Sequence, residues 1–511
     1  MLQGIVIVGG GTAGWMTASY LKVAFGDRIA ITLVESEQVG TIDVGEATFS
    51  TIRHFFEYLG LEEHEWMPSC HATHKLGIRF ENWREPGHHF YHSFERPRVV
   101  DGFNLTDWWL HNPRSDRFDR DCFLVANLSD HDRSPRHLDG SLFTGASEGV
   151  HRRSTLSEQS TQFPYAYHFD ATLLADFLRD FAVQRGVRHL RDDVVAVLQD
   201  DRGWISHLRT RASGDVAGDL FVDCTGFRGL LLGRTLEEPF ISYPDLPNDR
   251  SVALRVPTDT HCAQLHPYTT ATAQDAGWIW TIPLLGWIGT GYVYAETYCS
   301  PDEAERTLRE FVGSAAEELE ANHLRTRVGR SRRSWVRNCV AIGPSSGFVE
   351  PLESTGIFFI QHGVEQLVKH FPDERWDKTL ADAYNRRVEQ CMEGVREFLV
   401  LHYRGAARVD TKYWRDTKTR EIPAALTERL SRWRTKLPDA ESIFPSYHGF
   451  EAYSYVCMLI GLGGISLRAS SALSLLDSST AQREFALLSD EASELCQLLP
   501  TDYEYLMQLA W

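Results

Sequence analysis

The stretch IVIVGGGTAGWMTASYL, residues 5–21, decides the fold that the sequence predicts. A β-branched run, Ile5 to Val8, leads directly into a G-x-G-x-x-G pattern, and a helix-like pattern follows. Glycines at these positions permit a tight turn and bring the backbone close to a pyrophosphate, whose charge lies at the N-terminus of the helix. We therefore predict a strand, a helix and, between them, a dinucleotide cradle made by Gly9, Gly11, Thr12, Ala13 and Gly14.

A second predicted strand, IAITLVES at residues 29–36, ends in Glu35. It lies about 20 residues beyond the glycines, where an acidic side chain can hydrogen-bond a ribose hydroxyl. FAD and NAD both use such a cradle, but LFVDCTG (220–226) and CVAIG (339–343) each place a further strand ahead of a glycine turn. Two such returns resemble FAD domains of the glutathione-reductase and hydroxybenzoate-hydroxylase kind. The predicted fold is α/β, a Rossmann-type FAD domain with an added, mostly helical substrate module.

The composition limits the partners of this chain. Its 511 residues carry 52 Lys and Arg against 70 Asp and Glu, a net charge of −18, which disfavours nucleic acid and anionic membranes and favours small-molecule ligands. The start MLQGIVIVGGG lacks the basic region of a signal peptide, and no apolar stretch reaches membrane-spanning length. The nine cysteines are scattered without a C-x-x-C pair, so we expect free thiols, no metal site and a cytoplasmic protein.

A second candidate site lies in GFVEPLESTGIFFIQHGVEQLVKHF, residues 347–371. A loop is followed by apolar residues at the spacing of an amphipathic helix. Ser354 and Thr355 stand at N-cap positions, and Gly356 would let an anion approach the backbone N–H groups at the positive end of the helix. A plain capped helix is the alternative, since Glu353 would by itself repel an anion.

GWIWTIP, residues 277–283, is predicted to be a strand. Successive side chains of a strand point to opposite faces, so Trp278 and Trp280 would lie side by side, and Pro283 would end the pairing. For an isolated pair of tryptophans, ordinary core packing would be the preferred interpretation.

These segments together resemble the flavin-dependent halogenases. Phe348, Pro351, Ser354 and Gly356 match the family pattern F-x-x-P-x-x-S-x-G, with PLESTG in the form found in the tryptophan halogenases, and residues 278–283 match W-x-W-x-I-P. The other similar segments are VGEATFSTIRHFF (44–56), HKLGIRFENW (74–83), FPYAYHFDA (163–171) and EFLVLHY (397–403). The resemblance therefore covers essentially the whole chain.

The resemblance implies a reaction and its cofactors. FADH2, supplied by a separate NAD(P)H-dependent flavin reductase, reacts with O2 to give a C4a-hydroperoxide, which oxidises chloride or bromide to hypohalous acid. That acid passes through an internal tunnel to Lys75 and halogenates L-tryptophan. We find no second complete G-x-G-x-x-G for a nicotinamide dinucleotide, in agreement with an external reductase. We also expect a homodimer.

The resemblance also assigns roles. Lys75 and Glu353 are the expected catalytic residues. The lysine would hydrogen-bond hypohalous acid or become a chloramine, and the glutamate would orient the electrophile, stabilise the cationic ring intermediate or accept its proton. The backbone of Thr355 and Gly356 would hold the halide. The expected wall between flavin and tunnel consists of Trp278, Trp280, Pro351 and Ser354.

Further contacts follow from the matching motifs. Expected flavin contacts are Glu35, Gly45, Glu46, Ala47, Thr48, Gly343 and Phe348. Expected substrate contacts are Phe49, His92, Phe94, Tyr447, Glu451, Tyr453 and Tyr455. Two positions depart from the family pattern: Asp43 replaces a glycine in the strap beside the flavin, and Ser446 replaces the first of two tyrosines.

We divide the chain into a discontinuous FAD-binding domain, residues 1–80 and 160–365, and a substrate module, residues 81–159 and 366–511. The charge-rich stretch 111–160 is expected to run over the surface. The chain resembles the tryptophan 6-halogenases more than the 7-halogenases, and this resemblance implies FADH2-dependent chlorination or bromination of L-tryptophan at indole C6, as part of secondary metabolism such as antibiotic biosynthesis.

Several alternatives stay open. A tryptophan 5-halogenase is the nearest, and the acceptor could instead be another indole or a peptide-bound tryptophan. A flavin monooxygenase that inserts oxygen would share the cradle but would need neither Lys75 nor the anion loop. A catalytically silent FAD-binding protein would bind flavin without turnover.

Overall fold

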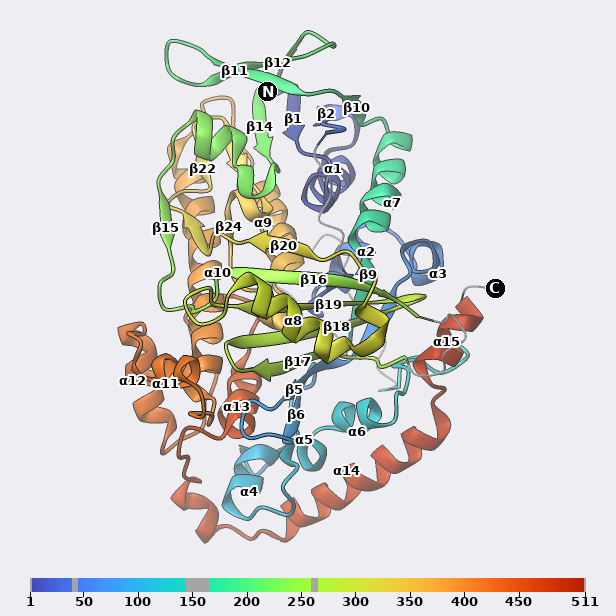
Figure 1. The fold of residues 1–511 in the computed structure, drawn as a ribbon, viewed down its shortest axis with the longest axis vertical. Helices are drawn as coiled ribbons and strands as arrows, with labels where there is room; N and C mark the ends of the chain where they lie inside the picture. The colour runs from blue at the N-terminus through green and yellow to red at the C-terminus, as the bar shows by residue number, and fades with distance from the viewer. Residues whose placement is uncertain (1, 39–44, 144–164, 259–264, 510–511) are drawn as a thin grey trace.

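The computed structural model describes residues 2–38, 45–143, 165–258 and 265–509. One sheet has the strand order β10-β2-β1-β14-β23-β22, and all its neighbouring strands are parallel except β23 and β22. Helices α1, α7 and α9 lie beside it (Figure 1). The bounds are β1 Gly4–Val8, β2 Ala30–Glu35, β10 Arg188–Arg191, β14 Leu220–Asp223, β22 Trp335–Val336, β23 Cys339–Ala341, α1 Thr12–Phe25, α7 Ala171–Gln184 and α9 Gly356–Lys369.

This sheet confirms the predicted fold class. The first strand, the glycine turn and α1 follow each other as the opening stretch predicts. The segments ending at Asp223 and Ala341 return to it as parallel neighbours, β14 beside β1 and β23 beside β14. The carboxyl ends of strands far apart in sequence therefore meet at one edge of the sheet, where doubly wound folds bind their cofactors.

A second sheet, in the order β20-β16-β19-β18-β17-β5-β6, lies across the middle of the molecule (Figure 1). Its pairs are antiparallel except β17 with β5, and α8 packs against β16 and β19. The bounds are β5 Gly77–Glu81, β6 His89–Ser93, β16 Arg250–Pro257, β17 Thr269–Gln274, β18 Gly277–Leu284, β19 Trp287–Tyr294, β20 Asn322–Arg325 and α8 Pro301–Val312.

The predicted tryptophan strand is β18. The expectation that Pro283 ends its pairing is wrong on one edge: pairing with β17 ends at Thr281, but Pro283 still stands opposite Ile288 of β19. Proline removes only its own N–H from a ladder. Its carbonyl is used as well, because the Thr73 hydroxyl donates to it at 2.8 Å.

A small sheet packs against β18 and β19 of the second large sheet. Strand β9 (Ala166–Asp170) pairs antiparallel with β3 (Gly45–Ala47) on one side and with β4 (Thr73–Lys75) on the other. Strand β4 is buried along its whole length. Lys75 is the last residue of β4. Its backbone is positioned by the pairing of β4 with β9, in which Lys75 stands opposite Ala166.

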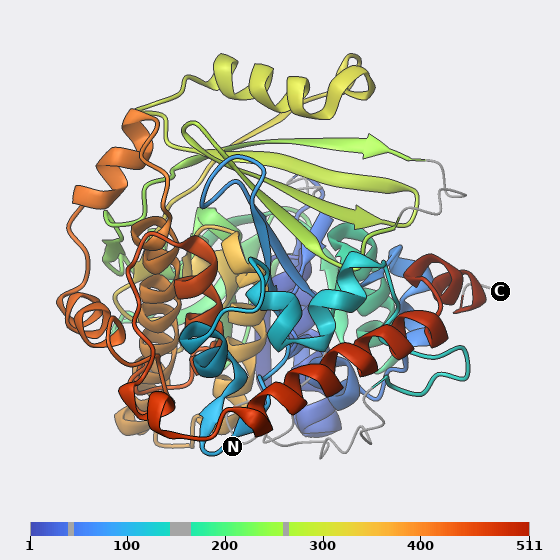
Figure 2. The ribbon, with the colours of Figure 1, turned by 90° about the horizontal axis from the view of Figure 1, so that it is seen from below.

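Helices complete the fold. The long helix α10 (Lys378–Gly405) packs against α9 and against α13 (Ala452–Leu462). Near the C-terminus, α14 (Ser479–Leu498) runs along one face of the molecule and leads to α15 (Asp502–Leu509) (Figure 2).

Part of the expected surface excursion at 111–160 is instead packed structure. Short helices α5 (Phe118–Cys122) and α6 (Leu124–Asp130) contact α14, and Phe118, Cys122 and Val125 are at most 3 % exposed. The acidic and basic residues between them mask these apolar positions in the sequence. Residues 144–160 of this stretch lie outside the described ranges.

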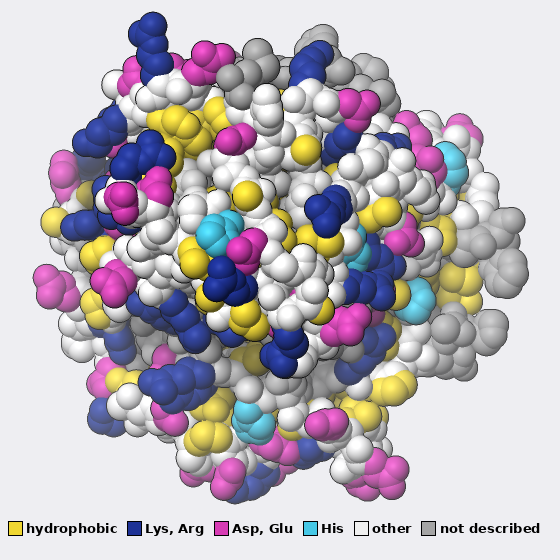
Figure 3. All heavy atoms as spheres, turned by 90° about the horizontal axis from the view of Figure 1, so that it is seen from above, with side chains coloured by type: hydrophobic (Ala, Val, Ile, Leu, Met, Phe, Trp, Pro, Cys, Tyr) yellow, Lys and Arg dark blue, Asp and Glu magenta, His cyan; other side chains and the backbone are white. Residues whose placement is uncertain are grey.

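The surface carries both charge signs. Figure 3 shows Lys and Arg side chains interspersed with Asp and Glu over one face. Among the described helices, none is long and apolar enough to cross a membrane. The cysteines that the structure describes are all free thiols. The division into an FAD domain and a substrate module stays a prediction.

Candidate active site

The glycines of the cradle are required by their surroundings. Gly9 has φ 112°, and a Cβ there would lie 2.3 Å from the carbonyl oxygen of Cys224. A Cβ on Gly14 would lie 1.8 Å from the carbonyl oxygen of Gly9, so the strand, turn and helix can pack only with glycine at both positions. At Gly11, by contrast, no described atom lies within 4 Å of a Cβ position. This open side lets a phosphate reach the uncapped N-terminus of α1.

Glu35 lies at the edge of the cradle. Its carboxylate is 2.7 Å from Nε2 of His189 and occupies the space in which a Cβ on Gly10 would stand. Gly343, at φ 76°, approaches Ala13 from the third segment, since its Cβ would be 3.0 Å from that of Ala13. The glycine turn, Glu35 and Gly343 therefore lie together although they come from separate segments, and they fit a dinucleotide.

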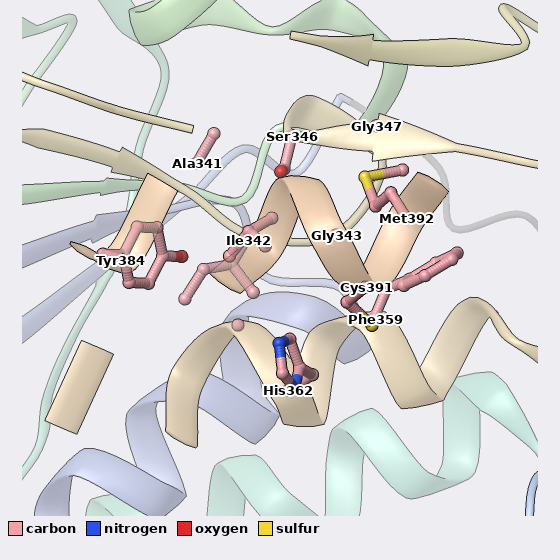
Figure 4. A pocket seen from close by; sticks show the side chains of 12 residues that line it. Ala341, Ile342, Gly343, Ser346, Gly347, Phe359, His362, Tyr384, Cys391 and Met392 are labelled. Carbon is pink, nitrogen blue, oxygen red and sulfur yellow. The ribbon is translucent and has the colours of Figure 1, made fainter. Parts of the chain in front are cut away.

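A small cavity lies next to Gly343. Figure 4 shows Gly343, His362 and Tyr384 among the residues around it. It has room for about one water molecule, and burial lowers the pKa of His362 to about 4. None of its lining residues is a predicted catalytic or substrate residue, so the cavity is separate from the candidate site of chemistry.

Lys75 is completely buried. Its Nζ donates to the carbonyl oxygen of Thr48 at 2.8 Å and to Oγ of Ser354 at 2.7 Å. Burial lowers the pKa of Lys75 to about 7, and the charge of Glu353 opposes that shift. Near neutral pH the side chain is thus divided between the amine and the ammonium form.

The loop that carries Glu353 is strained. Glu353 and Ser354 have φ values of 67° and 62°, in the left-handed region that residues other than glycine rarely adopt. Such strain persists only where surrounding contacts fix the backbone, and it gathers at functional sites. Here it turns the Glu353 carboxylate and the Ser354 hydroxyl into the interior, where both are buried.

Glu353 is held between two histidines. Its oxygens lie 2.8 Å from Nδ1 of His92 and 2.8 Å from Nε2 of His402, and the exposed fraction of all three side chains is zero. Burial alone would raise the pKa of Glu353, but His92 and His402 outweigh burial and hold it at about 2. The carboxylate is therefore the stable form at neutral pH.

The contacts of His402 place a proton between it and Glu353. Nδ1 of His402 is 2.8 Å from the Phe398 carbonyl oxygen, which can only accept, so Nδ1 carries a hydrogen. Nε2 can then bond Glu353 only if a second proton lies on the imidazole or on the carboxyl group. The sequence places this histidine in EFLVLHY, but no pattern there indicates its partner.

The N-terminus of α9 is open to an anion. In the described part of the chain, no side chain caps this helix, and the buried Oγ1 of Thr355 has no hydrogen-bond partner. No described atom lies within 4 Å of a Cβ position on Gly356. Bare N–H groups and a hydroxyl at a helix N-terminus suit a halide, and Lys75 lies next to the same loop through Ser354.

The paired tryptophans are buried on one face of β18, with ring centroids 6.3 Å apart. Trp278 points its indole N–H toward Glu350, at 3.4 Å, and Trp280 occupies the space beside Gly291, where a Cβ would lie 2.2 Å from its ring. Phe348 packs edge-on against Phe227.

An aromatic cluster lies beside Lys75. Nζ of Lys75 is 5.4 Å from the ring centroid of Phe94. Phe49 contacts Phe94 and Phe450, with centroid distances of 5.5 and 5.2 Å, and His92 faces Phe450 at 6.3 Å. The structure thus brings together the predicted Phe49, His92 and Phe94, and adds Phe450, which the sequence analysis missed although it directly precedes Glu451.

The predicted substrate residues of the C-terminal segment have different surroundings. Tyr453 lies 6.1 Å from the ring of His92, and Tyr447 contacts Phe358. Tyr455 is fully buried, its hydroxyl bonds Nε2 of His448 at 3.0 Å, and its ring contacts Phe398. Glu451 is half exposed. Asp43 lies outside the described residues.

Known proteins share this whole architecture. The family model described as tryptophan halogenase matches residues 4–477. The tryptophan 6-halogenase SttH of Streptomyces toxytricini is 62% identical over 98% of this chain and 97% of its own length, and its crystal structure superposes with a TM-score of 0.97 over 99% of each chain. The 7-chloro-L-tryptophan 6-halogenase KtzR of Kutzneria is 61% identical over 99% of both chains. Tar14, a tryptophan C-6 chlorinase from taromycin biosynthesis, is 59% identical over 100% of both chains, with a TM-score of 0.96.

Proposed function

The chain belongs to the tryptophan halogenase family, and from this premise we propose that it halogenates L-tryptophan at indole C6 with FADH2, O2 and chloride or bromide. The observation that carries the proposal is the position of Lys75, a fully buried amine bonded to Ser354 of the open anion loop and close to the charge of Glu353. Support for C6 comes from relatives named as 6-halogenases, which match this chain over nearly its whole length.

The cradle would hold the dinucleotide through the glycine turn, Glu35 and Gly343. Bound FADH2 would activate O2, and O2 would supply the oxidising equivalents that turn halide into an electrophile. The chain's own part begins with the halide, which the N-terminus of α9 would bind at Thr355 and Gly356.

Lys75 would fix the electrophile. With a pKa of about 7, its amine can either donate a hydrogen bond to hypohalous acid or be halogenated itself. Both routes place the halogen at one point beside the aromatic cluster, and the position of the ring against that point decides which carbon reacts. The buried surroundings keep bulk water away from this electrophile.

Glu353 would remove the ring proton. Its carboxylate form is stabilised by His92 and His402, so it is available as a base at neutral pH. While the ring carries positive charge, the same carboxylate stabilises it electrostatically. His402 already shares a proton with Glu353, as its hydrogen-bond geometry requires, and so holds the carboxylate in place.

We also propose that a separate NAD(P)H-dependent flavin reductase supplies FADH2 and that two copies of the chain associate. A second complete dinucleotide motif is not found in the sequence, which supports the external reductase. Light scattering after size-exclusion chromatography tests the dimer.

The decisive experiment combines the purified protein with a flavin reductase, FAD, NADH, O2, chloride and either L-tryptophan or 7-chloro-L-tryptophan. Mass spectrometry and proton NMR of the product should show one added chlorine at C6. Substitution at C5 would establish the 5-halogenase alternative, and oxygenation that persists without halide would establish a monooxygenase. Lys75→Ala should abolish halogenation while NADH oxidation continues; full product from this variant would refute the role of the lysine.

A further inference from the structure

An ion pair closes the outer end of the aromatic cluster. Arg96 makes a bidentate contact with Glu451, with Nε to Oε2 at 2.7 Å and Nη2 to Oε1 at 2.8 Å. The two side chains are 48% and 45% exposed. Arg96 follows Phe94 by two residues and Glu451 follows Phe450 directly, and both of these rings contact Phe49. The cluster therefore has Lys75 at its buried end and a pair of opposite charges at its solvent end.

The backbone on each side of Arg96 is anchored elsewhere. The Glu95 carboxylate accepts from the backbone N–H groups of Leu124 and Val125 at the start of α6. Arg98 forms ion pairs with two glutamates of α14, at positions 484 and 491. Between these anchored neighbours, a change of partner by Arg96 requires a rotation of its side chain and no movement of the backbone.

Glu451 can also exchange its ion-pair partner without a loss to the helix that it precedes. It stands at the N-cap of α13, yet its side chain makes no capping hydrogen bond to that helix; it is turned to Arg96 instead. Tyr453, in the first turn of α13, lies near the same arginine, because its phenol contributes, after Glu451, to raising the pKa of Arg96. The carboxylate thus has no structural task at the helix that a ligand would disrupt.

A half-exposed ion pair of this kind contributes only about 0–1 kcal/mol to stability, so a ligand that offers both charges can replace it at little cost. A free α-amino acid has an ammonium and a carboxylate on one carbon, and it matches this pair charge for charge. An indole ring in the aromatic cluster would carry those groups outward to the pair. Glu451 would accept from the ammonium, and the guanidinium of Arg96 would turn to the carboxylate.

We propose that Arg96 is a specificity-determining residue that exchanges Glu451 for the substrate carboxylate and so selects free L-tryptophan over peptide-bound tryptophan and decarboxylated indoles. This inference rests on the proposed function. It differs from a simple latch, in which Arg96 would only compete with the substrate for Glu451. The two ideas predict opposite effects of removing the arginine.

The test compares three ligands that differ only in their charges: L-tryptophan, tryptamine without the carboxylate, and indole-3-propionate without the ammonium. Isothermal titration calorimetry of the whole protein measures Kd for each. Arg96→Gln should weaken L-tryptophan and indole-3-propionate about tenfold, the loss expected for a charge-assisted hydrogen bond at a half-exposed position. Tryptamine should stay within about twofold of the parent, and Arg96→Lys should restore part of the loss.

Arg98→Gln is the matched control, since it removes an arginine of the same loop whose partners lie on α14. It should leave all three Kd values unchanged. In turnover, Arg96→Gln should raise KM for L-tryptophan with kcat preserved. Unchanged or tighter L-tryptophan binding by Arg96→Gln would overturn the proposal in favour of the latch, and equal weakening of all three ligands would show a merely structural role.

The inference and the proposed function can fail separately. If the parent protein halogenates L-tryptophan but Arg96→Gln binds it normally, the inference alone is wrong. If the parent binds L-tryptophan through Arg96 but produces no halogenated product, the proposed function fails and the inference stands. Absence of L-tryptophan binding by the parent protein would overturn both.

Discussion

The buried amine of Lys75 should make the stability of this protein depend on pH in a defined way. Its pKa is about 7 in the folded protein and about 10.4 in an unfolded chain. Below pH 7 both states bind the proton, and the folded state bears the full cost of burying the charge. Between pH 7 and 10 the unfolded state binds more protons, so stability rises with pH. The cost is about 4 kcal/mol at pH 7 and about 2 kcal/mol at pH 9.

Lys75→Met removes this cost. The variant also loses the hydrogen bonds to Thr48 and Ser354, but that loss does not vary with pH. The nearby Glu353 and His168 contribute little to the difference, because their pKa values are held low, at about 2 and well below 6.5. From pH 7 to pH 9, the parent protein should therefore gain about 2 kcal/mol relative to Lys75→Met.

The assay is urea denaturation followed by circular dichroism at pH 7, 8 and 9. Lys378→Met is the control, since Lys378 is 84% exposed and its removal should shift the free energy of unfolding equally at each pH. Parallel pH profiles for the parent and Lys75→Met would refute the reasoning. They would mean that the lysine keeps its proton in the folded protein, and that halogenation of its amine needs a prior deprotonation step.

Three further changes test other parts of the site. His402→Gln removes one of the imidazoles that lower the pKa of Glu353, so the acid limb of the pH profile of kcat should move to higher pH; an unmoved limb would contradict this. Thr355→Pro removes a backbone N–H at the start of α9, so half-maximal rate should need about tenfold more chloride, and an unchanged halide dependence would count against the site. Asp502→Ala leaves the buried His74 without its 2.6 Å partner, so urea denaturation should show a loss of about 3 kcal/mol; no loss would mean that this contact does not hold α15 in place.

Local patterns predicted the parts of the fold that depend on neighbouring residues. The cradle at Gly9, Gly11 and Gly14 and the tryptophan strand β18 follow from spacing and side-chain periodicity, and the structure contains both. Where the sequence analysis failed, a second partner decided the outcome. Pro283 keeps pairing because β19, on the opposite edge of β18 from β17, continues beyond the residue at which β17 ends.

The site itself depends on long-range contacts that no local pattern contains. His92 meets Glu353 across 261 residues of chain, and Arg96 meets Glu451 across 355. Family motifs indicated Lys75 and Glu353, but the motif around His402 was noted without a role for the histidine. The contact of His402 with Glu353 depends on the packing of α10 beside the strained loop, which the sequence pattern does not contain.

Two glutamates of that loop show why residue type alone cannot assign chemistry. Glu350 and Glu353 are both buried and stand three residues apart in FVEPLES. Burial raises the pKa of Glu350 to about 7, with donors such as Asn248 and Trp278 opposing the shift, whereas two histidines hold Glu353 at about 2. At neutral pH one carboxyl group is partly protonated and the other is an anion.

The left-handed backbone at Glu353 produces this difference. The positive φ turns its side chain toward the two histidines, while Glu350 bonds Asn248, Tyr403 and Trp278. Glu350 thereby supports the tryptophan strand, and Glu353 remains available to the substrate. The strain at Glu353 and Ser354 and the cost of burying Lys75 fall on the same small region, where stability is given up for the placement of a base and an amine. Contacts from three elements hold this region in place. His92 of β6 and His402 of α10 bond Glu353, and Lys75 of β4 bonds Ser354.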